Sequence, residues 1–178
     1  LAAATLAIAP ASAAPEAPLY DKFPYGVAWY PEQVSESEWT ADLDRMRSAH
    51  VTFVRMAEFA WSRIEPSEGR YDFGWLDRAI ALAEARGLKV LLGTPTAAPP
   101  AWLTQRYPEV LLVEADGRRA RHGGRRHASV SSALYRRRAA EIAARIAGRY
   151  GRHPAVLGFQ IDNEYGRETF DPAMRAAF

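Results

Sequence analysis

Four short apolar runs alternate with segments of helical periodicity, and this alternation most restricts how the chain can fold. The runs, each expected to be a strand, are Tyr25–Tyr30, Val51–Met56, Lys89–Leu92 and Val156–Ile161. The segments with helical spacing between them cover about 36–49, 74–86 and 133–150. Regular alternation of strand and helix predicts an α/β protein whose parallel sheet is wound with right-handed crossovers.

The connections favour one α/β fold over the others. Turns from helix to strand are tight, as at Ala49–His50 and Gly87–Leu88, whereas the segments leaving the strands are mostly long and rich in Trp, Pro, Arg and Glu. This asymmetry is typical of a (β/α)8 TIM barrel, whose active site is built from the loops after the strands. Four strands supply only about the first four β/α units, so we expect the front portion of a longer protein. A doubly wound nucleotide-binding fold would need a G-x-G-x-x-G turn, and the chain contains none.

The composition excludes several kinds of site. The 178 residues contain no cysteine, which rules out a disulfide framework and a thiolate metal centre. The four histidines show no H-x-x-x-H spacing, so neither a metal nor another cofactor is expected. A formal charge of +2 gives no reason to expect nucleic acid or another polyanionic partner. No stretch reaches the length needed to span a membrane.

Residues 1–18 have the character of a processing segment. Leu1–Ala9 is an apolar, alanine-rich run, and Ala11–Ala13 supplies an A-x-A cleavage pattern before a short Ala/Pro linker. We therefore expect residues 1–18 to be a partial signal peptide and linker, and the mature protein to be secreted. A disordered Ala/Pro tail is the alternative interpretation.

The fourth apolar run ends abruptly in three polar side chains, Asp162, Asn163 and Glu164. In α/β barrels the C-terminal ends of the strands carry the catalytic groups. A carboxylic acid there can protonate a glycosidic oxygen while a neighbouring amide holds a sugar hydroxyl. Taken alone, the Asn–Glu pair is equally compatible with a helix cap or a loop opening.

Six motifs narrow the interpretation. They are Y-G-V-A-W-Y-P-E-Q at 25–33, R-M-A-E-F-A-W-S-R-I-E-P at 55–66, G-R-Y-D-F-G-W-L-D at 69–77, T-P-T-A-A-P-P-A-W-L at 94–103, G-R-R-H at 124–127 and Q-I-D-N-E-Y-G at 160–166. In this order they resemble glycoside hydrolase family 42, the β-galactosidases. Residues 19–178 are therefore expected to be the N-terminal half of a TIM-barrel glycoside hydrolase catalytic domain. The combination is specific, although the Asn–Glu pair alone occurs in many barrel glycosidases.

The resemblance implies retaining hydrolysis of terminal non-reducing β-D-galactose residues in β-D-galactosides. Glu164 would be the proton donor and acid/base, and Arg125 and Asn163 would bind the substrate. For Arg125, a solvated loop charge is the alternative. Retention needs a second carboxylate about 5–5.5 Å from the first, and the family's nucleophile lies on a late strand beyond this chain. Glu58 does not match it and is expected to be a site-lining or structural carboxylate.

The resemblance also bears on metal binding and assembly. Some family members hold a structural zinc through a cysteine just after R-R-H and a cluster soon after the acid/base. Here those places read Ala128-Ser129 and Gly166–Phe170, so no zinc is expected and His127 is interpreted as a loop or packing residue. For the full-length protein the resemblance implies a possible homotrimer.

Two functions of other classes remain alternatives. A basic stretch could form a nucleic-acid-binding module, although Glu114 and Asp116 precede it; its arginines are Arg118, Arg119, Arg121, Arg125 and Arg126. A non-catalytic glycan-binding remnant of such an enzyme is the other alternative.

The five tryptophans divide into two groups. Trp29, Trp61 and Trp102 lie in or near strand ends, where they could stack on sugar faces or pack internally. Trp39 and Trp75 fall on helix faces and are expected in the core.

Overall fold

The computed structural model describes residues 23–177, so the predicted signal segment at 1–18 lies outside the described residues. The strands are β1 (Gly26–Ala28), β2 (Phe53–Met56), β3 (Lys89–Gly93) and β4 (Val156–Gln160). The helices are α1 (Trp39–Ser48), α2 (Trp61–Ile64), α3 (Gly74–Glu84), α4 (Ala101–Arg106), α5 (Ala133–Tyr150) and α6 (Pro172–Ala176). Short 3-10 turns are η1 (Pro31–Gln33), η2 (Pro95–Ala97) and η3 (Pro108–Val110).

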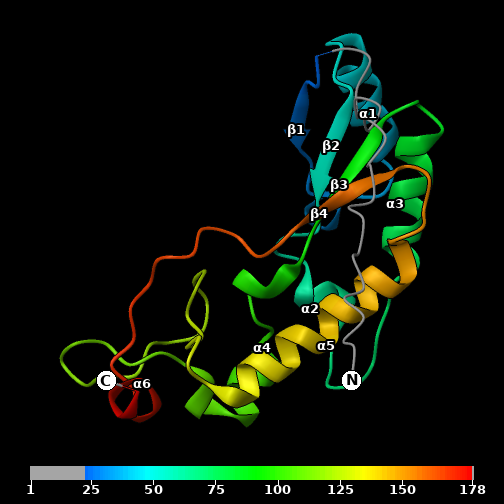
Figure 1. The fold of residues 1–178 in the computed structure, drawn as a ribbon. Coiled ribbons are helices and arrows are strands. Elements are labelled where there is room, and N and C mark those ends of the chain that lie inside the picture. Colours follow the sequence, from blue (N-terminus) through cyan, green and yellow to red (C-terminus); the bar gives the residue numbers. More distant parts are fainter. Residues whose placement is uncertain (1–22, 178) are drawn as a thin grey trace, which may run out of the picture.

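The four strands form one parallel sheet in the order β1-β2-β3-β4, with Met56 opposite Leu92 and Gly93 opposite Gln160. When successive right-handed crossovers all advance in one direction, the connecting helices are placed on one face of the sheet. Figure 1 shows α1 and α3 on the same side of the strands. A doubly wound sheet reverses its strand order and carries helices on both faces. The arrangement is that of consecutive β/α units of a barrel, as predicted.

The hydrophobic core joins the sheet to these helices. Val54 and Met56 of β2 and Val90 and Leu92 of β3 are buried at alternate positions of their strands. α3 adds a stripe of buried side chains at helical spacing, namely Trp75, Leu76, Ala79, Ile80 and Ala83. All of them belong to one cluster, so the helical periodicity and the strand alternation serve the same interior.

The long helix α5 has the bounds that its sequence pattern predicts. Ser132 caps it by accepting a hydrogen bond from the Tyr135 amide at 3.3 Å, and Gly151 follows its last residue. By contrast, α1 begins at Trp39, later than the predicted start near residue 36. The reason is a local turn, in which Glu38 accepts from the Ser35 amide at 3.1 Å and donates its own amide to the Ser35 carbonyl at 2.9 Å.

The tight turns from helix to strand share one backbone device. His50 after α1 and Gly87 after α3 both have left-handed φ values, of 60° and 69°. Each lets the next amide return to its helix, from Val51 to Met46 and from Leu88 to Ala83, both at 3.0 Å. His50 adopts this left-handed conformation although it is usually glycine that occupies it.

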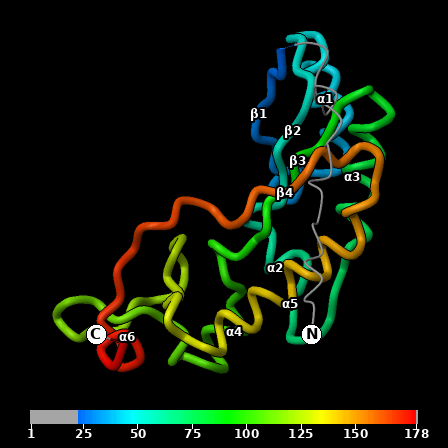
Figure 2. Tube along the Cα trace, viewed as in Figure 1, coloured from blue at the N-terminus to red at the C-terminus, as the bar shows by residue number. Residues whose placement is uncertain are grey.

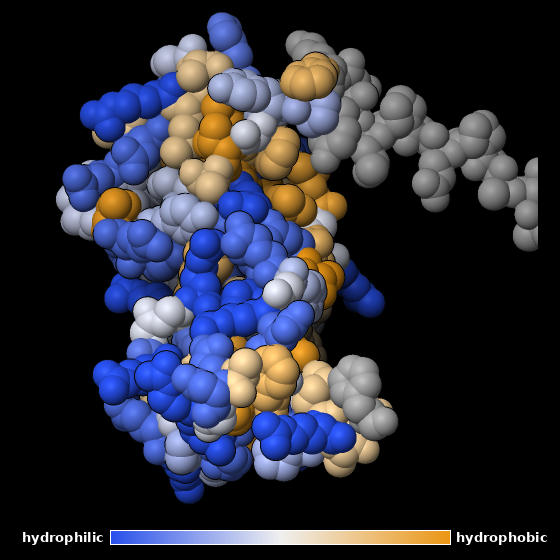
Figure 3. Space-filling model, turned by 90° about the vertical axis from the view of Figure 1, so that its left-hand side faces the viewer, coloured by the Kyte–Doolittle hydropathy of each residue, from blue (hydrophilic) through white to orange (hydrophobic). Residues whose placement is uncertain are grey.

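The face of the sheet away from the helices is open in residues 23–177. A shallow hollow on it is lined by Phe53 and Arg55 of β2, Leu91 of β3 and Gln160 of β4. Figure 3 views the molecule from the left-hand side of Figure 1; hydrophobic residues gather in the upper part of this view, and the middle of the molecule is mostly hydrophilic. No helix within the described part of the chain is both long and apolar enough to cross a membrane.

A close backbone approach joins β3 to the segment after β2. A Cβ atom added at Gly93 would lie 2.3 Å from Glu58 Cβ and 2.6 Å from Glu58 Cα. Such distances are far inside van der Waals contact, so only glycine fits at this position without movement of the neighbouring segment.

We predict that Gly93→Ala destabilises the whole protein by about 1–3 kcal/mol, because the methyl group must push the Glu58 backbone away. The midpoint of thermal unfolding measures the effect. Gly158→Ala in the adjacent strand is the matched control, since a Cβ there meets nothing within 4 Å. Equal midpoints for the two variants would contradict the prediction.

Candidate active site

The carboxyl ends of the parallel strands meet at one edge of the sheet, and a polar network joins them there. Arg55 of β2 donates through Nη1 to Gln160 Oε1 of β4 at 2.9 Å and pairs through Nη2 with Glu58 Oε1 at 2.8 Å. The Tyr30 hydroxyl, which follows β1, donates to the same Glu58 oxygen at 2.7 Å. One arginine and one glutamate therefore tie together the ends of three strands.

Glu58 is completely buried, with 0% of its surface exposed, and its Oε2 has no hydrogen-bond partner among residues 23–177. It holds the network together and presents no open surface, so the structure supports the structural role among the two that the sequence left open. Glu65 is also buried and accepts hydrogen bonds from Trp61 Nε1 and the Gly69 amide, both at 2.8 Å.

A second buried carboxylate, that of Glu32, is influenced by the charge of Glu58. Both oxygens of Glu32, in η1, are buried and lack a hydrogen-bond partner in the part of the chain described. Burial raises the pKa of Glu32 to about 7, and the negative charge of Glu58 adds to the shift. Near neutral pH a substantial share of the molecules therefore carries Glu32 protonated, which limits repulsion between the two carboxyl groups.

The three predicted site residues come from two segments, since Asn163 and Glu164 follow β4 whereas Arg125 lies in the long loop after β3. Arg125 Nη1 is 3.1 Å from Glu164 Oε2, and the two side chains are 55% and 67% exposed. Asn163, directly before Glu164, is largely buried and accepts a hydrogen bond from Gln160 Nε2 at 3.2 Å. The guanidinium of Arg125 also lies 5.5 Å from the centre of the Phe59 ring. The Glu164 carboxylate is therefore within reach of a ligand, with the Arg125 cation beside it and the amide side chain of Asn163 on the preceding residue.

Two further residues of this site received no catalytic or substrate-binding role from the sequence. Asp162, only 3% exposed, forms an ion pair with Arg126, and its Oδ2 accepts from Thr96 Oγ1 at 2.7 Å. Arg126 also donates to the Asn163 carbonyl at 2.9 Å. The signal for Asp162 was present in the polar D-N-E triplet, whereas nothing in the sequence distinguishes Arg126 from its neighbour Arg125.

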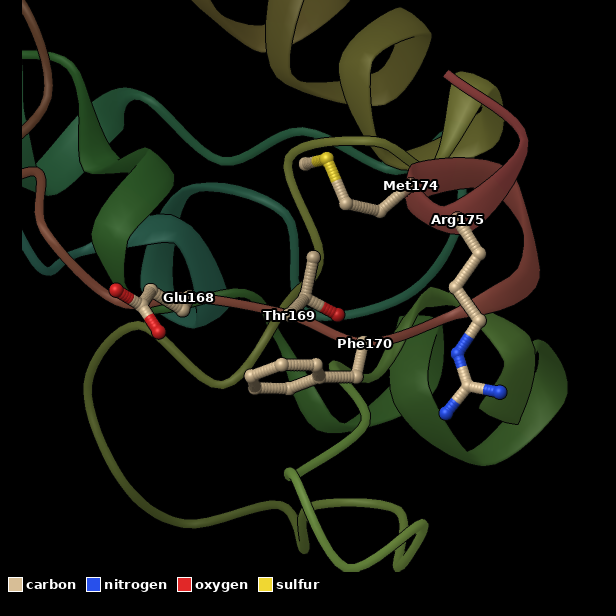
Figure 4. A pocket seen from close by; sticks show the side chains of 5 residues that line it. All are labelled: Glu168, Thr169, Phe170, Met174 and Arg175. Atoms are coloured by element: carbon tan, nitrogen blue, oxygen red, sulfur yellow. The ribbon is translucent and has the colours of Figure 1, made fainter. Parts of the chain in front are cut away.

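The segment that follows Glu164 is anchored to the long loop after β3. Figure 2 shows this segment leaving β4 and running towards α6. Asp171 Oδ2 accepts from three hydroxyl groups, those of Ser129 at 2.5 Å, Ser131 at 2.6 Å and Thr169 at 2.8 Å, and Oδ1 accepts from the Met174 amide at 3.0 Å. Figure 4 shows Thr169 and Met174 beside a pocket that the segment forms with α6.

Burial disfavours the charge of Asp171, but hydrogen bonds from Ser129, Ser131, the Met174 amide and Thr169 outweigh it. They hold the pKa of the Asp171 carboxyl well below its usual range. Two of its hydroxyl partners, Ser129 and Thr169, lie in the stretches Ala128-Ser129 and Gly166–Phe170, which stand where some members of the resembled family bind zinc. Within residues 23–177, no three His, Asp or Glu side chains gather in a way that could hold a metal ion.

The tryptophans pack inside the protein. Trp29 and Trp61 are buried, which rules out the sugar stacking that their positions near strand ends left open, and Trp39 and Trp75 are buried as predicted. Trp102 is partly buried and donates through Nε1 to the Glu65 carbonyl at 2.9 Å.

His127 is a packing residue, as one interpretation of the sequence held. Its ring is buried and meets the His122 ring edge to face, with the centres 4.9 Å apart. Burial lowers the pKa of His127, so the neutral imidazole is favoured.

Most arginines of the basic stretch have internal partners. Arg118 pairs with Asp116 at 2.7 Å, and Arg119 donates to the Leu111 carbonyl at 3.1 Å. Arg125 and Arg126 face Glu164 and Asp162. These arginines are spread over separate partners, which weighs against a continuous phosphate-binding stripe.

A parallel sheet covered by helices on one face, with a carboxylate, an amide and arginines after its strands, is the arrangement of the α/β-barrel class of proteins. The glycoside hydrolase 42 family model, described as Beta-galactosidase, matches residues 28–178. The chain belongs to this family, and its fold is that of the first β/α units of the TIM barrel.

Individual relatives agree with the family match. The beta-galactosidase of Thermus thermophilus is 55% identical over 141 residues, which are 79% of this chain and 22% of that protein. Beta-galactosidase BglY of Alicyclobacillus acidocaldarius is 41% identical over 172 residues, 93% of this chain and 24% of that protein. The crystal structure of the beta-galactosidase from Marinomonas ef1 aligns with a TM-score of 0.83 at 42% identity, over 87% of this chain and 24% of that one. The chain thus spans less than a quarter of these relatives.

We predict that Asp171→Asn loosens the segment after Glu164, with a loss of about 1–3 kcal/mol at neutral pH, since a charged acceptor is lost. Exchange of the Phe170 amide, which donates to the Val113 carbonyl at 2.8 Å, reports the opening. Asp116→Asn, at an exposed surface pair, is the matched control.

The pH dependence follows from the lowered pKa of Asp171. A depressed carboxyl pKa contributes stability that is complete above the unfolded value of about 3.9 and is lost as the pH falls through the folded value. The difference between wild type and Asp171→Asn should therefore be constant from neutral pH to about pH 4 and shrink below it. A difference that grows on acidification would contradict this assignment.

Proposed function

We propose that the whole protein is a retaining β-galactosidase that hydrolyses terminal non-reducing β-D-galactose residues from β-D-galactosides. Membership of the family supports this proposal. The single observation that carries it is the Glu164 carboxylate, exposed after β4, 3.1 Å from Arg125 and adjacent to Asn163. An acid, a cation and an amide in this arrangement suit protonation of a leaving group and recognition of sugar hydroxyls.

In the proposed mechanism Glu164 acts twice. As general acid it protonates the glycosidic oxygen while a nucleophilic carboxylate attacks the anomeric carbon, and as general base it then takes a proton from the water that releases galactose. Asn163 and Arg125 bind the galactosyl group. The family resemblance assigns the nucleophile to a later strand outside this chain.

The proton-donor role sets a condition on the surroundings of Glu164. A general acid must remain protonated near neutral pH, and burial is one of the ways to achieve this. Glu164 is 67% exposed among the described residues, and its nearest charged partner is Arg125. The proposal therefore requires further residues of the whole protein to cover this carboxyl group.

Two features of the whole protein are proposed on sequence and family resemblance alone. The alanine-rich stretch with the A-x-A pattern supports export and cleavage near Ala13, which N-terminal sequencing of secreted material would test. A homotrimer is the proposed assembly, which analytical ultracentrifugation would test.

We predict that Glu164→Gln lowers turnover of lactose by about 10²–10⁴-fold, because its glucose leaving group needs a proton. Aryl galactosides with activated leaving groups should lose less kcat/KM, and azide should restore turnover to Glu164→Ala. Glu168→Gln, an exposed glutamate on the same segment, is the matched control and should stay within about twofold. Near-normal lactose turnover by Glu164→Ala would refute the role of Glu164.

We predict that residues 1–178 expressed alone hydrolyse no galactoside, because retention needs two carboxylates and only Glu164 is assigned here. The assay is release of an aryl group from an aryl β-D-galactoside by the purified polypeptide. Turnover that disappears in Glu164→Ala would show that a second carboxylate within this chain suffices. Binding of galactose without turnover would favour the glycan-binding alternative for these residues.

A further inference from the structure

The carboxylate of Asp162 is fixed from three sides. Its Oδ2 accepts from Thr96 Oγ1 at 2.7 Å, and its Oδ1 accepts from Arg126 and from the Asn163 amide at 2.5 Å. The Asp162 amide donates to Thr94 Oγ1 at 2.7 Å. Two threonines at the end of β3 therefore hold a residue that follows β4, and both are buried.

Arg126 is fixed at both ends of the residue. Its amide donates to the Ala97 carbonyl at 2.8 Å, which ties the long loop to η2. Its guanidinium, largely buried, pairs with Asp162 and donates to the Asn163 carbonyl at 2.9 Å. The Tyr165 ring covers it, with 4.5 Å from the guanidinium carbon to the ring centre.

The backbone at this contact is strained. Arg126, Asp162 and Glu164 have φ values of 59°, 58° and 51°, in the left-handed region that side chains other than glycine rarely occupy. Conformations of this kind persist only where the surroundings hold them, and they concentrate at functional sites. Asp162 and Glu164 are both left-handed and are separated by Asn163. The Asp162 carboxylate is buried, whereas the Glu164 carboxylate is exposed.

We infer that the buried Arg126–Asp162 ion pair, held by Thr94 and Thr96, is the device that positions Asn163 and Glu164 for catalysis. The inference rests on the function proposed for Glu164. Arg126 and Asp162 are positioning residues, since neither contacts the reacting atoms. Arg126 directly follows Arg125, and Asp162 lies two residues before Glu164, with Asn163 between them. A shift of the buried pair therefore moves both halves of the exposed Arg125–Glu164 pair.

Two variants of the whole protein test this inference. Asp162→Asn removes the charge of the pair, and Thr96→Val removes one hydroxyl with little change of shape. Thr96→Ser keeps the hydroxyl and is the conservative control. The readout is kcat/KM, which reports glycosylation, over aryl β-D-galactosides of graded leaving-group pKa together with lactose. Glu164→Gln is measured in the same series.

Both variants should lose about 10- to 100-fold in kcat/KM on lactose and the poorest leaving groups, since small displacements of a catalytic group cost this much. Their loss should shrink towards activated leaving groups, in the same sense as for Glu164→Gln, because a misplaced acid matters most where the proton is most needed. Thr96→Ser should stay close to wild type.

The outcomes separate the inference from the proposed function. An equal loss on every leaving group would indicate a smaller folded fraction and overturn the positioning role, as would unchanged kcat/KM in both variants. If the loss of kcat/KM depends on the leaving group in Glu164→Gln but not in Thr96→Val, only the inference fails. If Glu164→Gln itself shows no such dependence, the proposed function fails and the inference with it. Should Asp162→Asn not fold, Thr96→Val against Thr96→Ser decides.

Discussion

The winding of the sheet in one direction is the constraint on which the rest of the structure depends. Because β1 to β4 follow one another in space as in sequence, the helices take one face of the sheet, and on the other face Arg55 and Gln160 lie beside Phe53 and Leu91. Arg55 can therefore reach across β3, from β2 to Gln160 on β4. The carboxyl ends of all strands reach the same edge, so residues far apart in sequence meet there as one site.

Charge at this edge is used in two different ways. The exposed Arg125–Glu164 pair contributes little to stability, as surface ion pairs generally do, and remains free to exchange partners. Hydrogen bonds with Thr96 and the backbone stabilise the buried Arg126–Asp162 pair. Without such partners, the loss of hydration on burying two charges would be destabilising. The neighbouring residues Arg125 and Arg126 thus belong to two different ion pairs, one accessible to a ligand and one buried as a support.

The sequence predicted the parts of the fold that depend on local pattern. α5 is bounded by Ser132 and Gly151, whose preferences for helix ends are local, and its predicted range was right. α4 was missed because Pro99 and Pro100 indicate a loop, although proline before a first turn is compatible with a helix. For the site, the strand-end position of Glu164 was visible, whereas the Arg126–Asp162 pair was not. Which of two neighbouring arginines is buried depends on tertiary contacts that no periodicity encodes.

The contact between Gly93 and Glu58 has an evolutionary consequence. The atoms that exclude a side chain at 93 include the Cα and amide nitrogen of Glu58, at 2.6 and 2.8 Å from the position of the missing Cβ. A smaller residue at 58 would not make room, because these backbone atoms would remain. A lineage therefore cannot replace this glycine by first changing its partner. Only a new path for the chain after β2 would open the position, which places it beyond the reach of single substitutions.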